Sequence, residues 1–371
     1  MLVQDFDYAL PDDRIAQEPA ARGESRLLVL DAPAGSPARH RRIGDLPELL
    51  RPGDLLVVND TRVIPARLFG RRVAEAGGEG GRVELLLVER RERTASPDAG
   101  AGAGPGEEWD VLARPGRKAR PGARIRFAGG LEAEVLERLG DGRYRLRFSE
   151  PVEPHLERVG HVPLPPYIKR PDRPEDRERY QTVFAERPGA IAAPTAGLHF
   201  TPELLARLAA RGIATARVTL HVGIGTFKPV TATLVHEHVM DRERYEVPEA
   251  AAAAIAETRR RGGRVVAVGT TVVRTLESAA ARAEAAGAPP GEVAAGAGRT
   301  DLFIYPGFRF RVVDALLTNF HLPRSTLLML VAAFAGRERV LAAYQEAIAE
   351  GYRFYSYGDA MLVERTEHDG R

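Results

Sequence analysis

The hydrophobic pattern changes its period along the chain, and the change predicts two kinds of structure. Up to about residue 62, short apolar runs at 26–31 (RLLVLD) and 54–58 (DLLVV) predict buried strands joined by loops. From 63 to 153, strand-like runs are separated by Gly and Pro and show no helical period of useful length. These runs cover 82–90, 109–113, 124–127, 131–138 and 143–148. Short strands at such spacing are typical of a small β-barrel.

From about residue 154 onward, helix and strand patterns alternate. Thr201 and Pro202 mark a helix start, because an N-cap residue is followed by a first-turn proline, and Gly212 marks the end of that helix. The run 264–269 (RVVAVG) predicts a buried strand, and the segment 270–280 that follows it has a helical pattern. Strands and helices that alternate in this way indicate an α/β domain.

The two patterns together predict a domain inserted into another domain. Further strands are expected at 301–305 and 310–313. We therefore expect a discontinuous α/β domain, formed by 1–62 and 154–371, with a mixed sheet and helices. The small β-barrel over 63–153 would be inserted into it.

Composition excludes several classes of protein. The 371 residues are 44% hydrophobic and 28% charged, which is ample for a packed core and excludes an intrinsically disordered chain. The longest purely apolar run, 327–335, is far shorter than the ~20 residues of a membrane-spanning helix. The acidic start MLVQDFDYALPDD lacks the order of a signal peptide. The absence of cysteine excludes disulfides, thiolate-bound zinc and cysteine nucleophiles. We expect a cytoplasmic protein without a membrane partner.

Charge is nearly balanced, so a role in nucleic-acid binding would have to come from local clustering. The formal net charge is +2. The segment 111–126 (VLARPGRKARPGARIR) holds no acid, and its basic residues are Arg114, Arg117, Lys118, Arg120, Arg124 and Arg126. Lys169 and Arg170 would extend the cluster if they lay nearby. Such a cluster is compatible with a solvated face or with a surface that follows phosphates, which would position an RNA backbone without reading its bases.

Three stretches combine glycine, histidine and hydroxyl residues. They are 193–200 (APTAGLHF), 221–230 (HVGIGTFKPV) and 318–326 (TNFHLPRST). Glycine lets the backbone approach a ligand closely, and hydroxyls and imidazoles supply hydrogen-bonding groups near neutral pH. Each stretch lies where a strand or loop meets another element, which is where ligand sites of α/β proteins form. The alternative for any one of them is turn chemistry with histidines packed in the core.

Known sequence motifs for other chemistries are weak or missing. Gly223 and Gly225 lack the third glycine of a dinucleotide fingerprint. No HExxH, facial triad or Cys/His set occurs, so we expect no metal site. No Walker A or Gly-x-Ser-x-Gly sequence occurs either. The strand–turn–helix 264–274 carries Thr270 and Thr271, whose hydroxyls could hold a carboxylate or could equally cap the helix.

Long segments in conserved order match the motifs of one enzyme family. They are SRLLVLD at 25–31, NDTRVIPARLFG at 59–70, PLPPYIKR at 163–170, APTAGLHF at 193–200, LHVGIGTFKPV at 220–230, EHVM at 237–240, GTTVVRTLES at 269–278, FIYPGFRF at 303–310, NFHLPRSTLLMLVAAF at 319–334 and YSYGDAML at 355–362. Over almost its whole length the chain resembles the S-adenosylmethionine:tRNA ribosyltransferase-isomerases of queuosine biosynthesis. Two positions depart from the family pattern. Asp241 stands where the pattern HxMHxE has its second histidine, and Val272 stands where a small hydroxyl residue is usual.

The resemblance implies a reaction. The ribosyl moiety of S-adenosylmethionine would be transferred to 7-aminomethyl-7-deazaguanine at the wobble position of a tRNA with a G-U-N anticodon, and isomerised to give epoxyqueuosine. Adenine and methionine would leave. S-adenosylmethionine would be consumed as a substrate, so no cofactor is expected. We expect the protein to be a monomer.

The reaction needs a base, because the sulfonium acidifies the adjacent C5′ hydrogens, and it needs a proton donor for adenine. On this reasoning the catalytic candidates are His199, His221, His321 and Asp60, the last as an acceptor for the aminomethyl group or the base edge. The residues expected to bind S-adenosylmethionine are Thr195, Gly197, Gly223, Gly225, Thr226, Thr270, Thr271, Arg274, Asn319 and Arg324, with Arg274 or Arg324 clamping the methionine carboxylate. The residues expected to contact the base or the tRNA are Asn59, Arg62, Arg114, Arg117, Lys118, Arg120, Lys169 and Arg170.

Two other classes compete with this interpretation. An S-adenosylmethionine-dependent RNA methyltransferase is favoured by the loop at Gly223 and Gly225, but the acidic ribose ligand of a full fingerprint is missing. The second alternative is an RNA-binding module built around the barrel. The released products distinguish the three classes. Ribosyl transfer releases adenine and methionine, methylation releases S-adenosylhomocysteine, and binding alone releases no product.

Overall fold

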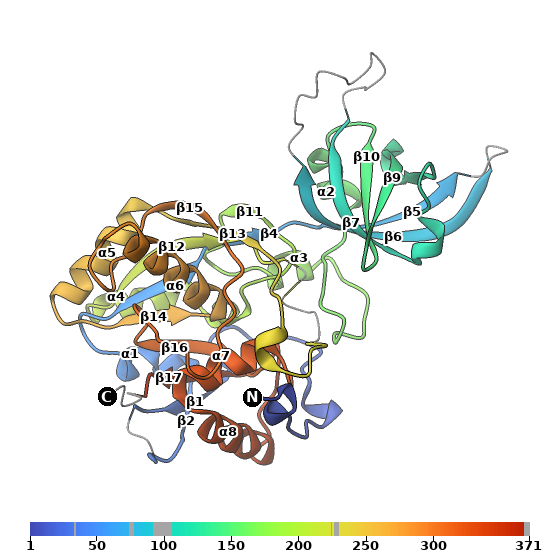
Figure 1. Cartoon of the computed structure of the whole chain (residues 1–371). Coiled ribbons are helices and arrows are strands. Elements are labelled where there is room, and N and C mark those ends of the chain that lie inside the picture. The colour runs from blue at the N-terminus through green and yellow to red at the C-terminus, as the bar shows by residue number, and fades with distance from the viewer. Residues whose placement is uncertain (33–34, 74–77, 92–105, 224, 226–229, 367–371) are drawn as a thin grey trace. The chain divides into compact units, whose positions relative to one another are not determined.

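The structure is a computed structural model that describes residues 1–32, 35–73, 78–91, 106–223, 225 and 230–366 (Figure 1). It divides into two compact units. The first comprises Met1–Arg62, Pro165–Arg170 and Glu178–Arg371, and the second comprises Val63–Leu164 and Pro171–Arg177. The division therefore draws the border after the barrel at Leu164, and not at 153, and it adds a short later segment to the barrel unit.

The first unit is built around a nine-stranded mixed sheet. In spatial order its strands are β15 (Gly296–Thr300), β13 (Glu243–Val247), β12 (Ala214–Leu220), β3 (Leu55–Asn59), β14 (Val265–Val268), β16 (Ala315–Asn319), β17 (Ala360–Glu364), β1 (Arg26–Leu30) and β2 (Arg39–Arg42). The four central strands from β12 to β16 are parallel. Most of their residues are apolar and buried, since both faces of a parallel sheet are usually covered, although Thr215 and Arg217 of β12 are exposed.

Helices cover each face of this sheet (Figure 1). On one face pack α5 (Glu249–Arg260), α6 (Thr270–Ala285), α7 (Thr326–Ala335) and α8 (Arg337–Ala349). On the other face pack α1 (Leu46–Leu49) and α4 (Pro202–Ala210), together with the 3-10 turn η6 (Thr195–His199). Alternate residues along a strand go to opposite cores, as Leu56 and Val57 of β3 do. The expected mixed sheet with helices is confirmed.

The second unit contains a closed barrel of six antiparallel strands, which confirms the barrel expected from the sequence. The strands are β5 (Arg67–Val73), β6 (Glu79–Arg91), β7 (Glu108–Arg114), β8 (Arg124–Phe127), β9 (Glu132–Gly140) and β10 (Arg143–Phe148). The helix α2 (Glu153–Val159) follows in the same unit. Elsewhere, β4 (Thr61–Val63) pairs with β11 (Arg187–Ala190), and α3 covers Asp176–Arg179.

Two expected strands are wrong. The segments 301–305 and 310–313 are irregular, and the edge strand β15 lies earlier, in a glycine-rich stretch. The glycines of β15 have a packing role, because a Cβ on Gly298 would lie 2.5 Å from the ring of Tyr245 on the neighbouring strand. Only glycine fits against this ring, so tertiary packing selects a strand that intrinsic propensity disfavours.

No helix within the described part of the chain is both long enough and apolar enough to cross a membrane.

Candidate functional site

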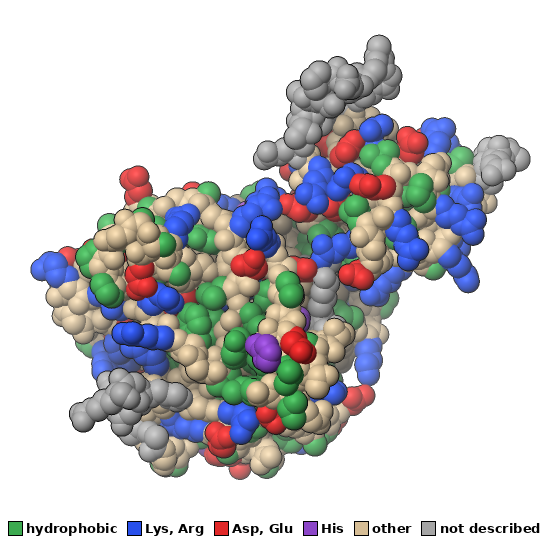
Figure 2. Space-filling view, in the orientation of Figure 1, with side chains coloured by type: hydrophobic (Ala, Val, Ile, Leu, Met, Phe, Trp, Pro, Cys, Tyr) green, Lys and Arg blue, Asp and Glu red, His purple; other side chains and the backbone are tan. Residues whose placement is uncertain are grey.

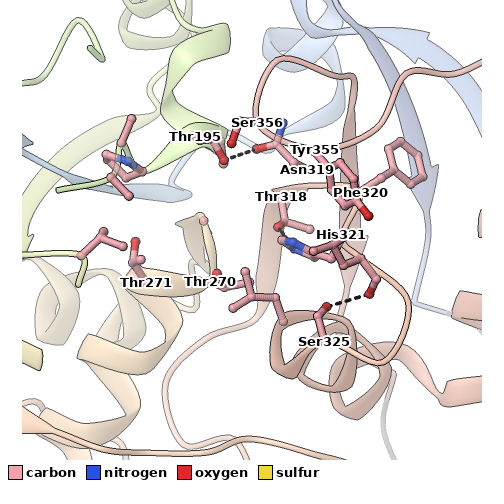
Figure 3. A pocket seen from close by; sticks show the side chains of 18 of the residues that line it. Thr195, Thr270, Thr271, Thr318, Asn319, Phe320, His321, Ser325, Tyr355 and Ser356 are labelled. Carbon is pink, nitrogen blue, oxygen red and sulfur yellow. Dashed lines mark hydrogen bonds between the residues drawn. The ribbon is translucent and has the colours of Figure 1, made fainter. Parts of the chain in front are cut away.

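A pocket opens at the carboxyl ends of the central parallel strands, within the first unit (Figure 3). It contains about 690 Å³ of empty space, including its mouth. The segments that follow β12, β14 and β16 contribute to its wall, together with the turn at 192–196 and the loop at 355–356. In open α/β sheets the carboxyl ends of the strands are where ligands bind. All three glycine- and histidine-containing stretches found in the sequence supply at least one lining residue.

The floor of the pocket is a sharp strand-to-helix turn. Strand β14 ends at Val268, Gly269 adopts φ +93°, and α6 begins at Thr270. Glycine is required here because side chains rarely tolerate this backbone conformation. The N-cap residue of α6 is Gly269, which has no side chain to cap the helix, and Thr270 and Thr271 both line the pocket. The first turn of this sixteen-residue helix therefore presents backbone N–H donors and a partial positive charge beside the cavity.

Asn319 is fixed in the pocket wall by a chain of hydrogen bonds. The hydroxyl of Thr195 donates to its Oδ1 at 2.9 Å (Figure 3). Its Nδ2 donates to Nε2 of His199 at 3.1 Å, so Nδ1–H of His199 donates to Ser25 Oγ at 2.9 Å. His199 is buried and does not line the pocket, because Asn319 lies between its ring and the cavity. Burial, with a smaller effect of Arg353, lowers the pKa of His199 to about 4, so its ring is neutral near pH 7.

His321 is the histidine that does line the pocket (Figure 3). Its Nε2 is hydrogen bonded to Thr318 Oγ1 at 2.8 Å, and its backbone N–H donates to the hydroxyl of Tyr344 at 3.0 Å. Burial lowers the pKa of His321 to about 3. The imidazole is therefore neutral near pH 7, which is the form that can accept a proton.

A second polar group surrounds His221 and Asp60. Nδ1 of His221 is hydrogen bonded to Thr61 Oγ1 at 2.8 Å, and a Cβ on Gly189 would lie 2.8 Å from the ring. Burial lowers the pKa of His221, helped by the charges of Arg244 and Arg187. Neither His221 nor Asp60 lines the pocket, although Val222, next to His221, does.

Asp60 is buried and accepts a hydrogen bond from Thr219 Oγ1 at 2.6 Å. Burial raises the pKa of Asp60, and the hydrogen bond from Thr219 only partly offsets this effect. Nε of Arg187 lies 3.9 Å from its Oδ2. A histidine with a lowered pKa and a carboxyl with a raised pKa thus lie on adjoining segments, a combination that is common at sites of proton transfer.

Asn59 plays a different part from the one expected of a base-pocket residue. Its Nδ2 donates to the carbonyl of Leu220 at 3.0 Å and to Thr271 Oγ1 at 3.3 Å. Its Oδ1 accepts from the N–H groups of Thr61 and Leu220, both at 3.1 Å. It does not line the pocket, because it ties β3 to β12 and to the start of α6. Arg62 is exposed.

The structure does not bring Arg274 or Arg324 into the pocket. Arg274 is buried and forms an ion pair with buried Glu243, whose Oε1 accepts the N–H of Gly223 at 2.8 Å. A buried guanidinium requires such a partner, and the pair holds the chain just after β12. Arg324 is exposed, and its Nε lies 3.7 Å from Asp7 Oδ1.

The expected glycines contribute backbone packing. A Cβ on Gly197 would lie 2.8 Å from Thr182 Cγ2, and one on Gly225 would lie 3.0 Å from Asp241. Neither they nor Gly223 line the pocket, while Thr226 lies outside the described residues.

Sequence reasoning missed several residues of this region. Tyr167, Tyr355 and Ser356 line the pocket, and the hydroxyls of Tyr167 and Ser356 are hydrogen bonded to each other. Glu243 was also missed. The signal that could have found Tyr355 and Ser356 is the motif YSYGDAML, whereas Glu243 resembles any other acidic residue until its burial is known.

The basic residues expected to contact RNA lie in different surroundings. In the barrel unit, Arg114, Arg117 and Arg120 are exposed, and Nζ of Lys118 donates to the carbonyl of Arg82 at 3.3 Å. In the first unit, Lys169 pairs with Asp12 at 3.3 Å, and Arg170 pairs with Glu18 at 2.9 Å. Within the described part of the chain, no group of three or more His, Asp or Glu side chains has the arrangement of a metal site.

Comparison with known proteins supports one family. The model of the family described as queuosine biosynthesis protein matches residues 3–363. An S-adenosylmethionine:tRNA ribosyltransferase-isomerase of Gloeobacter violaceus is 58% identical over 98% of this chain and 96% of its own length. The enzyme of the same name from Pelobacter propionicus is 54% identical over 98% of this chain and its full length.

A solved structure agrees with these relatives. The crystal structure of an S-adenosylmethionine tRNA ribosyltransferase from Thermotoga maritima is 41% identical, covers 97% of this chain and 99% of its own, and superposes with a TM-score of 0.52. Since the family model spans nearly all of the sequence and the relatives are similar over their whole lengths, the chain belongs to the queuosine biosynthesis protein family.

Proposed function

We propose that this protein is an enzyme that transfers the ribosyl moiety of S-adenosylmethionine to a modified guanine of tRNA and isomerises it, with release of adenine and methionine. The acceptor would be 7-aminomethyl-7-deazaguanine at the wobble position of a G-U-N anticodon, and the product epoxyqueuosine. The observation that carries the proposal is the pocket at the carboxyl ends of β12, β14 and β16, where hydroxyl, amide and imidazole groups stand among apolar residues, in a chain of this family. S-adenosylmethionine would be consumed there as a substrate.

The pocket suits a sulfonium nucleoside. Its wall combines apolar side chains with a few hydroxyl, amide and imidazole groups, as small-molecule sites do. The methionine carboxylate would lie at the N-terminus of α6, whose N-cap residue is glycine, beside Thr270 and Thr271, where backbone N–H groups and the helix dipole favour an anion. The helix N-terminus would then bind the carboxylate in place of Arg274 or Arg324, to which the sequence had suggested this role.

Side chains of the pocket wall would carry out the proton transfers of the reaction. His321 is neutral and lines the pocket, so it is the candidate base for the C5′ proton, which the sulfonium acidifies. Asn319 and Thr195 would hydrogen bond the adenine and help it to leave. His199 would act as a positioning residue, because it fixes the amide of Asn319 and reaches the substrate only through it.

The acceptor base would be held by the polar group around Asp60 and His221. A carboxyl and a hydroxyl are suited to the aminomethyl group and the guanine edge, which the base must expose by leaving the anticodon stack. The exposed arginines of the barrel unit would contact the tRNA backbone. The expected monomer remains a proposal.

The test is product analysis. Purified protein would be incubated with labelled S-adenosylmethionine and an anticodon stem-loop that carries the precursor base. We expect adenine and methionine in equal amounts, with the label of the ribose in the RNA. S-adenosylhomocysteine would instead show a methyltransferase, and an unchanged substrate with tightly bound RNA would show a binding module.

A further inference from the structure

Three arginines form a row across the outer surface of the barrel. Arg82 on β6 lies directly opposite Arg71 on β5, and Arg71 lies directly opposite Arg126 on β8. All three residues are exposed. Residues directly opposed on antiparallel strands project from the same face, and neighbouring strands lie about 4.8 Å apart. The three positive charges therefore stand side by side over about 10 Å.

This arrangement is slightly unfavourable for the barrel, because like charges directly opposite each other destabilise a strand pair. Acidic residues of the barrel neutralise the positive charges of the row only in part. Arg126 pairs with Glu132 at 2.8 Å, and Arg71 pairs with the exposed Glu79 at 3.3 Å. Arg82 makes no ion pair with the described residues, and its guanidinium lies 4.5 Å over the ring of Phe69. Exposed pairs of this kind contribute little, so the row is suited to an external anion.

The row borders a groove in the same unit. The groove is lined by Phe69 and by Arg71, Arg72, Arg82 and Arg126, with Glu79 as the one acid among its described lining residues. Nε of Arg72 is buried without a hydrogen-bond partner in the described part of the chain. Figure 2 shows Lys and Arg side chains gathered over β5 and β6. The groove therefore combines several cations with an aromatic ring, the combination by which proteins follow a single strand of nucleic acid.

The row also continues the basic segment that the sequence singled out. Nζ of Lys118 donates to the backbone carbonyl of Arg82 at 3.3 Å, which places the turn after β7 at one end of the row. The exposed Arg117 belongs to the same turn. Residues from β5, β6, β8 and this turn thus form one basic surface, although they are scattered over the sequence.

We propose that Arg71, Arg82 and Arg126 bind consecutive phosphates of one RNA strand, with Phe69 in contact with a sugar or base. The proposal rests on the proposed function in that the RNA is the tRNA substrate. Guanidinium groups bind phosphate through paired hydrogen bonds, whereas the row offers nothing that distinguishes one base from another. Its role would be to fix the tRNA while the chemistry takes place elsewhere in the protein.

The experiment compares R71Q/R82Q with the wild type in binding unmodified tRNA, without S-adenosylmethionine, at several salt concentrations between about 50 and 200 mM. We expect the double variant to bind at least about 10-fold more weakly at the lowest salt concentration. Each lost phosphate contact should reduce the slope of log affinity against log salt by about 0.7 to 0.9. In turnover, KM for tRNA should rise, while kcat and KM for S-adenosylmethionine stay unchanged.

The matched control is R138Q, which removes an exposed arginine of β9 that makes no ion pair with the described residues. It should keep the wild-type affinity and slope. R71K/R82K should keep most of the slope, because the point charges remain. Wild-type affinity and slope in R71Q/R82Q would overturn the proposal, as would an equal loss in R138Q. If the variant loses RNA binding but the wild type releases no adenine from S-adenosylmethionine, the proposed function fails and the RNA surface stands.

Discussion

The pocket at the sheet ends and the arginine row on the barrel use polar residues in opposite ways. In the pocket wall, Asn319 and His199 are buried, and each is held by hydrogen bonds from other parts of the chain. On the barrel, Arg71 and Arg82 are exposed and only partly paired. Buried polar groups are costly to disturb, whereas exposed charges contribute little to stability. In the proposed function the chemistry would therefore depend on residues that also hold the fold together, while the proposed RNA surface should accept substitutions without unfolding of the protein.

The largest effect on activity is expected from His321→Ala. Removal of a general base typically slows turnover 10²- to 10⁴-fold, and we expect this loss in kcat with little change in RNA binding. Because its pKa lies at about 3, His321 should give the pH–rate profile no inflection between pH 5 and 8. Single-turnover release of adenine is the measurement. Thr201→Ala, at the N-cap of α4 and outside the pocket, is the control. A wild-type rate in His321→Ala would exclude this residue as the base.

The largest effect on stability is expected from Glu243→Gln. This change leaves the Arg274 guanidinium buried without its counter-charge, and breaking a buried pair in this way costs about 3 to 5 kcal/mol. The double variant Glu243→Leu/Arg274→Met should recover much of that loss, since it removes both charges. Urea unfolding monitored by circular dichroism would measure the free energy of unfolding of both variants. A loss below about 1 kcal/mol in Glu243→Gln would contradict the importance of the pair.

A fall in pH is expected to have an intermediate effect on the stability of the fold. The unfolded pKa of His199 is near 6.5 and the folded one about 4, so the unfolded state binds more protons between these values. Stability must therefore fall as the pH drops below 6.5, with about 2 kcal/mol lost at pH 5 on account of this histidine. His199→Gln should make the unfolding free energy less dependent on pH in this window. The same dependence in the wild type and the variant would show that another group is responsible.

The smallest effect on stability is expected on the barrel. R71Q and R82Q should each change the free energy of unfolding by less than about 0.5 kcal/mol, because the side chains are exposed. Thermal unfolding of R71Q and R82Q, compared with that of the control R138Q, would test this. A large destabilisation would mean that the row holds the barrel together, and the contrast with the pocket would then disappear.

Much of the architecture could be predicted from the sequence. Gly/Pro-separated runs over 63–153 predicted the barrel, and alternating elements predicted the α/β sheet, because both patterns follow from local periodicity. The edge strand β15 could not be predicted in this way. Its glycines disfavour a strand, and Gly298 is required only once Tyr245 is known to lie against it.

The candidate site could be predicted only in part. The sequence supplied Thr195, Asn319 and His321, which meet in one pocket, and it singled out the motifs that end the strands. It placed His199 and Arg274 there too, but the structure puts His199 behind Asn319 and pairs Arg274 with Glu243. The residue types were informative, whereas the direction in which each side chain points depends on packing.

By itself, the sequence determined the fold class, the family and the kinds of residue available for chemistry, because these depend on composition, periodicity and motif order. Only the tertiary structure decided that His321 reaches the pocket and that His199 lies behind Asn319. It also decided that Arg71, Arg82 and Arg126 stand in one row. The reason is that strand pairing and burial join residues far apart in the chain, and no local pattern records which partner each residue will meet.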